Sequence, residues 1–469
     1  MAHSPWSWPM SWRIIILLNI SFYNLLGNSY AAGLSNVLAL PLATLIGKRY
    51  TVLLSLTLFL GACLWSGEAT SFASLRASRL LGGLAGGLIE ALGPHFVIET
   101  FPEHQLARAM VIYVGLLAGG SAVGPIVSGA IGYHLDSWRW FLRVLSIAIF
   151  CTLLSSLAML PETTHDGPLV GLDGFLDDGD RATDDELAKY EARAASQVET
   201  ADTAKVDNAV TTNNHAEAAP SSLWQEYKER SWSLKYVRLQ QWREAVRGLY
   251  QPLMLLMAPQ VVVTVVVFGL TVGWTVVMSI VTASVYAQPP VLFNSLQVGL
   301  ISIGPLLGLI VGLPIGGAFA DWLANRSLRR HGGEHRPASR LPAAFLGGLV
   351  SPAGCVVFGY GMRDPAAHWA QVCVGWGMLC VGLTGSSNVL LTYAVDCLPT
   401  RAAHIGMLIN LAKNLIGFGV SYASISWYES AGPVRQFGTM AGLLFAANLC
   451  IIPIAIYSKR VISKTAWLA

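Results

Sequence analysis

Residues 252–287 read PLMLLMAPQVVVTVVVFGLTVGWTVVMSIVTASVYA, and this stretch decides the class of protein. It carries no charged side chain over its 36 residues. A helix that crosses a bilayer needs only ~20 mostly apolar residues. The stretch therefore predicts a membrane-spanning helix.

The rest of the chain has the same apolar character. Apolar residues make up 54% of its 469 residues, charged residues only 12%, and the mean hydropathy is +0.52. Soluble domains contain ~25% charged residues, so this composition excludes an ordinary cytosolic enzyme. It also excludes a disordered protein, because too much apolar surface would stay unburied. The apolar runs are long and continuous, which favours an all-α polytopic membrane protein over a membrane barrel.

Nine further runs are long enough to cross a bilayer, which gives ten clear spans in all. Residues 13–47 are too long for one straight span and too short for two full ones. We expect two abbreviated or re-entrant helices there, broken near Gly27, with one long tilted helix as the alternative. The nine runs are residues 50–66, 75–98, 106–132, 138–160, 298–320, 341–361, 368–395, 404–427 and 437–457.

Composition divides the chain into two bundles and a loop. The segment Pro161–Tyr250 holds 17 of the 27 acidic residues, and its part 162–221 is expected to be disordered. Residues 223–246 mix aromatic with basic side chains and predict an interfacial amphipathic helix, or else a helix that docks a partner. Two six-span halves favour alternating access, with a substrate site between them near mid-membrane. The expected domains are residues 1–160, the cytoplasmic loop 161–251, and residues 252–469.

Lysine and arginine fix the expected orientation. With a cytoplasmic N-terminus, most basic loop residues fall on the cytoplasmic side, including Lys48, Arg49 and those at 326–340. The net charge of +3 gives no reason to expect nucleic acid. The expected partners are a small-molecule substrate and the lipid bilayer, with the chain acting as a monomer. We expect the plasma membrane, with a vacuolar or other internal membrane as the alternative.

Two loops at equivalent points of the halves share a motif. LPLATLIGKR at residues 40–49 resembles the cytoplasmic GxxxDRxGRR loop of the major facilitator superfamily, and GAFAD at 317–321 is similar to its GxxxD part. In that family the glycine makes a tight turn, and the charges hold the cytoplasmic face. The alternative for the first loop is that Lys48 and Arg49 only mark the cytoplasmic end of a span, as basic residues commonly do. The residues that would carry these conformational roles are Gly47, Lys48, Arg49, Gly317 and Asp321.

The fifth span contains GSAVGPIVSG at residues 120–129, which resembles the GxxxGPxxGG element of drug:proton antiporters. Small residues let helices approach closely, and proline bends the helix axis. We expect this face to let the two halves rock, with Gly124 at the close approach. Ordinary helix packing is the alternative. The motif positions are Gly120, Gly124, Pro125 and Gly129.

Further elements narrow the resemblance to the 12-span drug:proton antiporter group, in its fungal branch. LRASRLLGG at 75–83 resembles the family's LxxxRxxQG element, which implies proton coupling by Arg79; snorkelling of Arg79 to the interface is the alternative. YAVD at 393–396 is familiar in fungal members, and we expect its Asp396 to pair with Arg401 or the loop arginines. NLAKN at 410–414 is similar to the branch of histidinol and polyamine carriers and secondary-metabolite exporters.

Charged side chains inside the membrane are the candidate functional residues, because each costs at least ~2.5 kcal/mol there. Glu90 lies about three helical turns from Arg79, close to mid-membrane, and suits a proton carrier or a cation site. Lys413 lies well inside its span, and Asn410 and Asn414 flank it at helical spacing. A structural salt bridge or hydrogen-bond network is the alternative for each charge.

The sequence therefore favours a proton-coupled secondary transporter for a small organic molecule, exporting a drug or secondary metabolite. Uptake of a cationic nutrient such as a polyamine, with Glu90 as the cation site, is the first alternative. A non-transporting membrane sensor is the second. We find no catalytic or metal-binding pattern, such as HExxH or a P-loop, so we expect no enzyme and no cofactor beyond the proton gradient.

Overall fold

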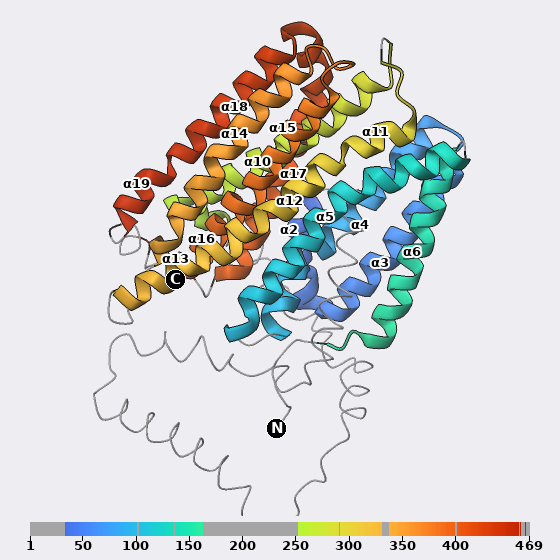
Figure 1. The fold of residues 1–469 in the computed structure, drawn as a ribbon. Helices are drawn as coiled ribbons and strands as arrows, with labels where there is room; N and C mark the ends of the chain where they lie inside the picture. Colours follow the sequence, from blue (N-terminus) through green and yellow to red (C-terminus); the bar gives the residue numbers. More distant parts are fainter. Residues whose placement is uncertain are drawn as a thin grey trace, which may run out of the picture. The chain divides into compact units, whose positions relative to one another are not determined.

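The computed structural model describes residues 33–100, 103–135, 137–162, 252–289, 291–330, 337–398, 401–458, 460 and 465. These residues are almost entirely helical, and no strand occurs among them (Figure 1). The helices of the N-terminal half are α2 (Gly33–Ile46), α3 (Lys48–Glu68), α4 (Phe72–Thr100), α5 (Glu103–Leu135) and α6 (Trp138–Met159).

The C-terminal half begins with the short η6 (Leu255–Met257) and the long α10 (Pro259–Tyr286). Its second span is α11 (Ser295–Ile301), α12 (Ile303–Pro314), the π-helical η7 (Ile315–Phe319) and α13 (Ala320–Arg330). Its remaining elements are η8 (Pro337–Arg340), α14 (Leu341–Gly361), α15 (Trp369–Gly382), the π-helical η9 (Leu383–Ser387), α16 (Asn388–Cys397), α17 (Ala402–Ala431), α18 (Pro433–Leu449) and α19 (Ile451–Ile456).

The predicted spans are confirmed as helices. Nine helical stretches in the described part of the chain are long and apolar enough to cross a membrane. They match nine of the ten predicted spans, and the tenth, residues 404–427, lies inside the 30-residue helix α17. Asn410, Lys413 and Asn414 lie within this helix.

The second predicted helix of the stretch 13–47 is described from Gly33 onward as α2. It ends at Ile46, and the next residue, Gly47, has a φ of 88°, a left-handed conformation that favours glycine. The first predicted helix of the stretch 13–47 and its break near Gly27 lie outside the described residues.

All the described residues belong to one compact unit, which contains both predicted bundles. The amphipathic helix predicted at 223–246 lies outside the described residues. The prediction that the disordered segment begins at Glu162 is wrong for that residue. Glu162 is only 1% exposed and holds the start of α3, as described below.

Each bundle buries its own apolar core. The N-terminal core joins α3, α4 and α6 through residues such as Phe59, Phe96 and Ile149. The C-terminal core includes an edge-on pair of rings, Phe358 and Phe437, whose centroids are 4.6 Å apart. In both bundles the spans are held by apolar burial together with close helix packing.

Glycines set the packing inside the C-terminal bundle. A Cβ atom added at Gly304, Gly308 or Gly312 of α12 would collide with α15 or η9, against Cys373, Gly377 and Thr384 respectively. The first two collisions are with backbone atoms, which cannot move aside cheaply. Helix α12 therefore lies against its neighbours at a distance that only glycine allows.

The bundles meet along two seams. On one, α17 packs against α2 and α4; on the other, α5 runs beside α11 and α12 (Figure 1). Both seams join segments far apart in the sequence; Glu90 and Lys413 lie along the first, and the glycine motif of α5 lies along the second.

Candidate functional site

A buried ion pair joins the two bundles. Lys413 of α17 contacts Glu90 of α4 through its Nζ atom and the Oε1 atom of the carboxylate. The side chains are only 7% and 6% exposed, and both lie away from the ends of their helices. At this burial an uncompensated charge of either sign would cost several kcal/mol, so each group balances the other.

Two asparagines complete this arrangement. Asn414 Nδ2 donates to Glu90 Oε2 at 3.1 Å, and Asn410 Nδ2 donates to the Glu90 backbone oxygen at 3.2 Å. Spacings of three and four residues place Asn410, Lys413 and Asn414 on one face of α17. The carboxylate therefore meets an ammonium on one oxygen and an amide donor on the other.

The structure thus brings together four of the five predicted coupling residues. Glu90 pairs with Lys413 across the seam, which matches the salt-bridge alternative stated for each charge. Arg79 does not join them, since it lies eleven residues earlier on α4, ~16 Å along the axis, and its side chain is exposed. This position matches the snorkelling alternative for Arg79.

Sequence reasoning missed one neighbour of the pair. Tyr113 of α5 is 1% exposed, its hydroxyl has no hydrogen-bond partner, and it interacts electrostatically with Glu90. The only signal was a polar hydroxyl in an apolar run, which is too common in membrane helices to single out a residue. Tyr113 brings a third helix to the pair, from the bundle that carries Glu90.

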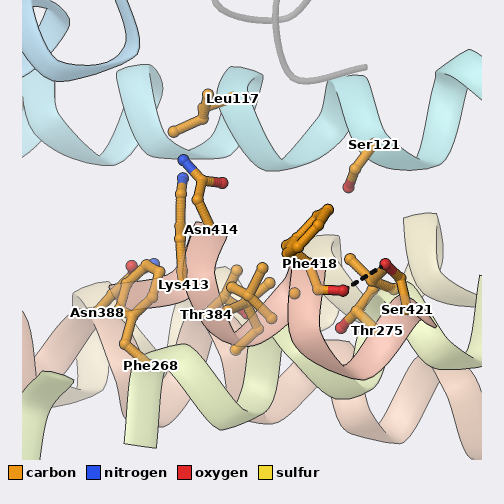
Figure 2. A pocket seen from close by; sticks show the side chains of 14 residues that line it. Leu117, Ser121, Phe268, Thr275, Thr384, Asn388, Lys413, Asn414, Phe418 and Ser421 are labelled. Carbon is orange, nitrogen blue, oxygen red and sulfur yellow. Dashed lines mark hydrogen bonds between the residues drawn. The ribbon is translucent and has the colours of Figure 1, made fainter. Parts of the chain in front are cut away.

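A cavity of about 290 Å³ lies beside the pair, between α5, α10, η9, α16 and α17. Figure 2 shows Lys413 and Asn414 reaching from α17 toward the helix that carries Leu117. The walls are mainly apolar. The lining residues are Leu117, Ser121, Phe268, Val272, Thr275, Val276, Leu383, Thr384, Asn388, Lys413, Asn414, Gly417, Phe418 and Ser421.

The motif loop of the N-terminal half holds two helices together. The carboxylate of Glu162 accepts hydrogen bonds from the backbone N–H groups of Lys48 at 3.2 Å and Arg49 at 3.0 Å. A carboxylate at a helix N-terminus satisfies orphan N–H donors and complements the helix dipole. Arg49 is buried, and its guanidinium donates to the Leu157 oxygen of α6 at 3.0 Å. Arg49 therefore links α3 to α6 inside the bundle, and it does more than mark the cytoplasmic end of a span.

We expect Glu162→Gln to lower the free energy of unfolding by about 1–3 kcal/mol, because an amide nitrogen would face a backbone N–H donor. The measurement is thermal unfolding of the purified protein in detergent. Glu68→Gln is the matched control: Glu68 pairs with Arg143 at 2.8 Å, but the two side chains are 70% and 43% exposed. Such a surface pair contributes at most ~1 kcal/mol. Equal melting temperatures for the two variants would contradict the role of Glu162.

The equivalent loop of the C-terminal half is held by Arg340. Its guanidinium bonds Asp396 at 3.1 Å and lies 3.6 Å from Asp321. Asp396 was expected to pair with Arg401 or a loop arginine, and Arg340 is the loop arginine that the structure provides. Gly317 lies just before this cluster, in the π-helical η7. In each half, a charged side chain thus links neighbouring segments at the same point of the fold.

The glycine motif of α5 packs against α11, but not at the predicted residue. A Cβ atom at Gly124 would meet nothing within 4 Å, whereas one at Gly129 would collide with the Ser295 oxygen. From the other side, a Cβ atom at Gly299 would lie 2.7 Å from the Pro125 oxygen. The expected close approach is real, but it lies at Gly129 and Gly299. Gly120 is buried on the same helix.

Sequence comparison assigns this architecture to a family. The model of the family described as Major Facilitator Superfamily matches residues 16–422. The chain belongs to the Major Facilitator Superfamily. It is therefore a multi-pass membrane transporter rather than an enzyme.

Fungal members of the superfamily are similar over most of the chain. An uncharacterized MFS-type transporter of Schizosaccharomyces pombe is 23% identical, over 92% of this chain and 76% of its own length. Protein HOL1 of Saccharomyces cerevisiae is 22% identical, over 92% and 78% respectively. Efflux pump FUBT of Fusarium oxysporum is 24% identical, over 84% of this chain and 58% of its own length. The predicted resemblance to fungal members of the superfamily is confirmed.

Solved structures support the superfamily fold. A POT family transporter in complex with 5-aminolevulinic acid matches with a TM-score of 0.54 and 12% identity, covering 96% of this chain and 95% of its own. A mutant of the peptide transporter POT matches with a TM-score of 0.55 and 16% identity, covering 95% and 87%. At these identities the likeness concerns the fold alone.

Proposed function

We propose that this transporter moves a small organic molecule through the cavity by alternating access, and that Glu90 takes up and releases the coupled proton. The observation that carries the proposal is the Glu90–Lys413 pair, buried where the two bundles meet. A proton on Glu90 removes the charge that attracts Lys413. A single protonation then changes the strength of a contact between the bundles, which is what coupling requires.

The proposed direction is export of a drug or secondary metabolite. Support comes from similar fungal proteins whose names describe efflux pumps, such as the Fusarium oxysporum protein. The alternative of uptake of a cationic nutrient receives less support. Among the described residues that line the cavity there is a lysine and no carboxylate. We place the protein in the plasma membrane as a monomer, with a vacuolar or other internal membrane as the alternative site.

A substitution that fills the cavity tests whether substrate passes through it. Gly417 lines the cavity, and a Cβ atom there would meet only a methyl group of Val276 at 3.9 Å. We expect Gly417→Leu to fold and insert normally, because space is available, and to reduce flux at least tenfold. The measurement is flux of labelled drugs and fungal metabolites in reconstituted vesicles with an imposed pH gradient.

Gly419 provides the matched control two residues along α17. A Cβ atom at Gly419 would meet nothing within 4 Å, and this residue does not line the cavity. Gly419→Leu therefore adds the same side chain to the same helix outside the cavity, and flux should stay near the parent level. Equal flux through both variants would show that substrate does not pass through this cavity.

A further inference from the structure

Charge on the cavity wall is one-sided. Lys413 is the only charged side chain among the described lining residues, and its partner Glu90 is not one of them. The cavity therefore touches the lysine of the pair and not its carboxylate. Because an ammonium offers hydrogen-bond donors and no acceptor, this wall favours a ligand with negative charge.

The other polar groups on the cavity wall are few. Asn414 lines the cavity next to Lys413, and the hydroxyls of Ser121 and Ser421 line it on two helices. The Oδ1 atom of Asn388, which also lines it, is buried without a hydrogen-bond partner and can accept from an O–H or N–H group of a ligand. At about 290 Å³, the cavity is at the lower end of ligand pockets, which span roughly 300–1,000 Å³. It suits a molecule built around one ring or a short chain.

Charge balance then determines whether a proton binds together with such a ligand. In the empty site Glu90 and Lys413 sum to zero. An anion on Lys413 would leave the buried site with one uncompensated negative charge, at a cost of several kcal/mol. A proton from water on Glu90 removes that charge, because the neutral acid leaves the anion as the partner of Lys413. One anion and one proton restore a sum of zero.

We propose that the substrate is a small organic acid, bound as its anion to Lys413 while Glu90 carries one proton. The inference rests on the proposed proton site and adds the substrate class and the direction of the proton. Anion and proton cross together, in contrast to the antiport that the family resemblance implies. Net flux of the acid then follows the sum of its own concentration gradient and the proton gradient.

Few other groups near Glu90 can exchange that proton. Lys413 on α17 and Tyr113 on α5 face it. Helix α2 has no titratable side chain in its described span Gly33–Ile46. Among the side chains that the structure describes, the remaining titratable groups on the packed helices lie farther along them: Lys48, Arg49, Tyr50, Cys63 and Glu68 on α3, Arg76, Arg79 and His95 on α4, Tyr133 and His134 on α5, and His404, Tyr422, Tyr428 and Glu429 on α17.

A cation would give the opposite coupling. A substrate cation bound to Glu90 would keep the sum at zero only if Lys413 lost its proton, so cation and proton would move in opposite directions. Ligand charge and proton movement are therefore linked, and both can be measured in a single binding experiment.

Isothermal titration calorimetry of the purified full chain in detergent tests the proposal. The probes are benzoate, benzamide and benzylammonium, which share a ring and differ in charge, together with hexanoate, hexanamide and hexylammonium. Titrations in buffers of different ionisation enthalpy report the protons exchanged on binding. We expect benzoate or hexanoate to bind at millimolar concentration with uptake of one proton, and to bind about tenfold tighter per pH unit lowered.

Glu90→Gln gives a second readout, because it leaves Lys413 without a counter-charge. We expect benzoate or hexanoate to raise the melting temperature of this variant more than that of the parent, since the anion replaces the lost carboxylate. Should the single variant fail to fold, the titration of the parent chain still decides the question.

The outcomes separate the two proposals. Anion binding without proton uptake would refute Glu90 as the proton site while keeping the acid as substrate. Binding of an ammonium probe with proton release would overturn the proposal that the substrate is an acid and would keep the proposal of proton coupling. Equal binding of an acid and its amide, or binding of no probe, would overturn the assignment of an organic acid.

Discussion

The double variant Glu90→Gln/Lys413→Met should fold and insert like the parent chain and yet lose proton-driven transport completely. The two side chains form one buried pair, so removing both charges leaves no uncompensated group. Replacing a buried ion pair by neutral groups of similar volume is often neutral or stabilising, by up to about 4 kcal/mol. Asn414 can still donate to the amide oxygen that glutamine provides at position 90.

The single variants are expected to behave differently. Glu90→Gln alone strands a buried ammonium, and Lys413→Met alone strands a buried carboxylate. Breaking a buried pair in this way costs about 3–5 kcal/mol, so both single variants should melt well below the parent. The comparison of single with double variants separates stability from coupling, because only coupling stays lost in the double variant.

The measurement pairs thermal unfolding in detergent with flux in vesicles under an imposed pH gradient. Asn410→Ala is a useful reference, because it removes a hydrogen bond to the Glu90 backbone and leaves the ion pair in place. Its cost should be ~1–3 kcal/mol, with the pH dependence of flux unchanged. A double variant with normal uphill transport would show that the pair is structural and that the proton binds elsewhere.

The second large effect is expected at the seam between α5 and α11. Gly299→Ala places a methyl group 2.7 Å from the Pro125 carbonyl oxygen, a backbone atom that cannot rotate away. The helices must then separate, and the loss of close contact should hold this seam partly open. We expect flux to fall at least tenfold, because alternating access needs each seam to close in turn.

Alanine substitutions are enough to test this seam, because the methyl group of alanine already clashes with the backbone of the other helix. Gly129→Ala approaches from the other helix, so it should reproduce the effect of Gly299→Ala. Gly124→Ala is the matched control on α5, where a Cβ atom meets nothing within 4 Å. Flux by all three variants, with their level in the membrane, is the measurement. Normal flux in Gly299→Ala and Gly129→Ala would show that the close approach is not needed for transport.

The spans were predictable because hydropathy and length act locally. An uncharged apolar run such as residues 252–287 predicts a membrane helix independently of the rest of the chain. The depths of Glu90 and Lys413 followed in the same way, from counting residues along a helix. Their pairing did not follow, because nothing in either helix says that α4 and α17 share a seam.

Two other residues show where local reasoning ends. Glu162 begins a long acidic segment, so the composition of that segment masked a carboxylate that caps α3. The motif at 120–129 offers several small residues at helical spacing, and sequence cannot tell which of them faces a partner. Gly129 faces α11, whereas Gly124 has open space. Both cases depend on tertiary contacts, which neither composition nor periodicity contains.

The glycine contacts inside the C-terminal bundle have a mechanical consequence. Helices packed to backbone distance, such as α12 against α15 and η9, cannot slide past one another without opening voids or overlapping atoms. Elastic compliance is therefore low within this bundle. A force applied at its cavity wall moves the bundle as one rigid body instead of deforming it.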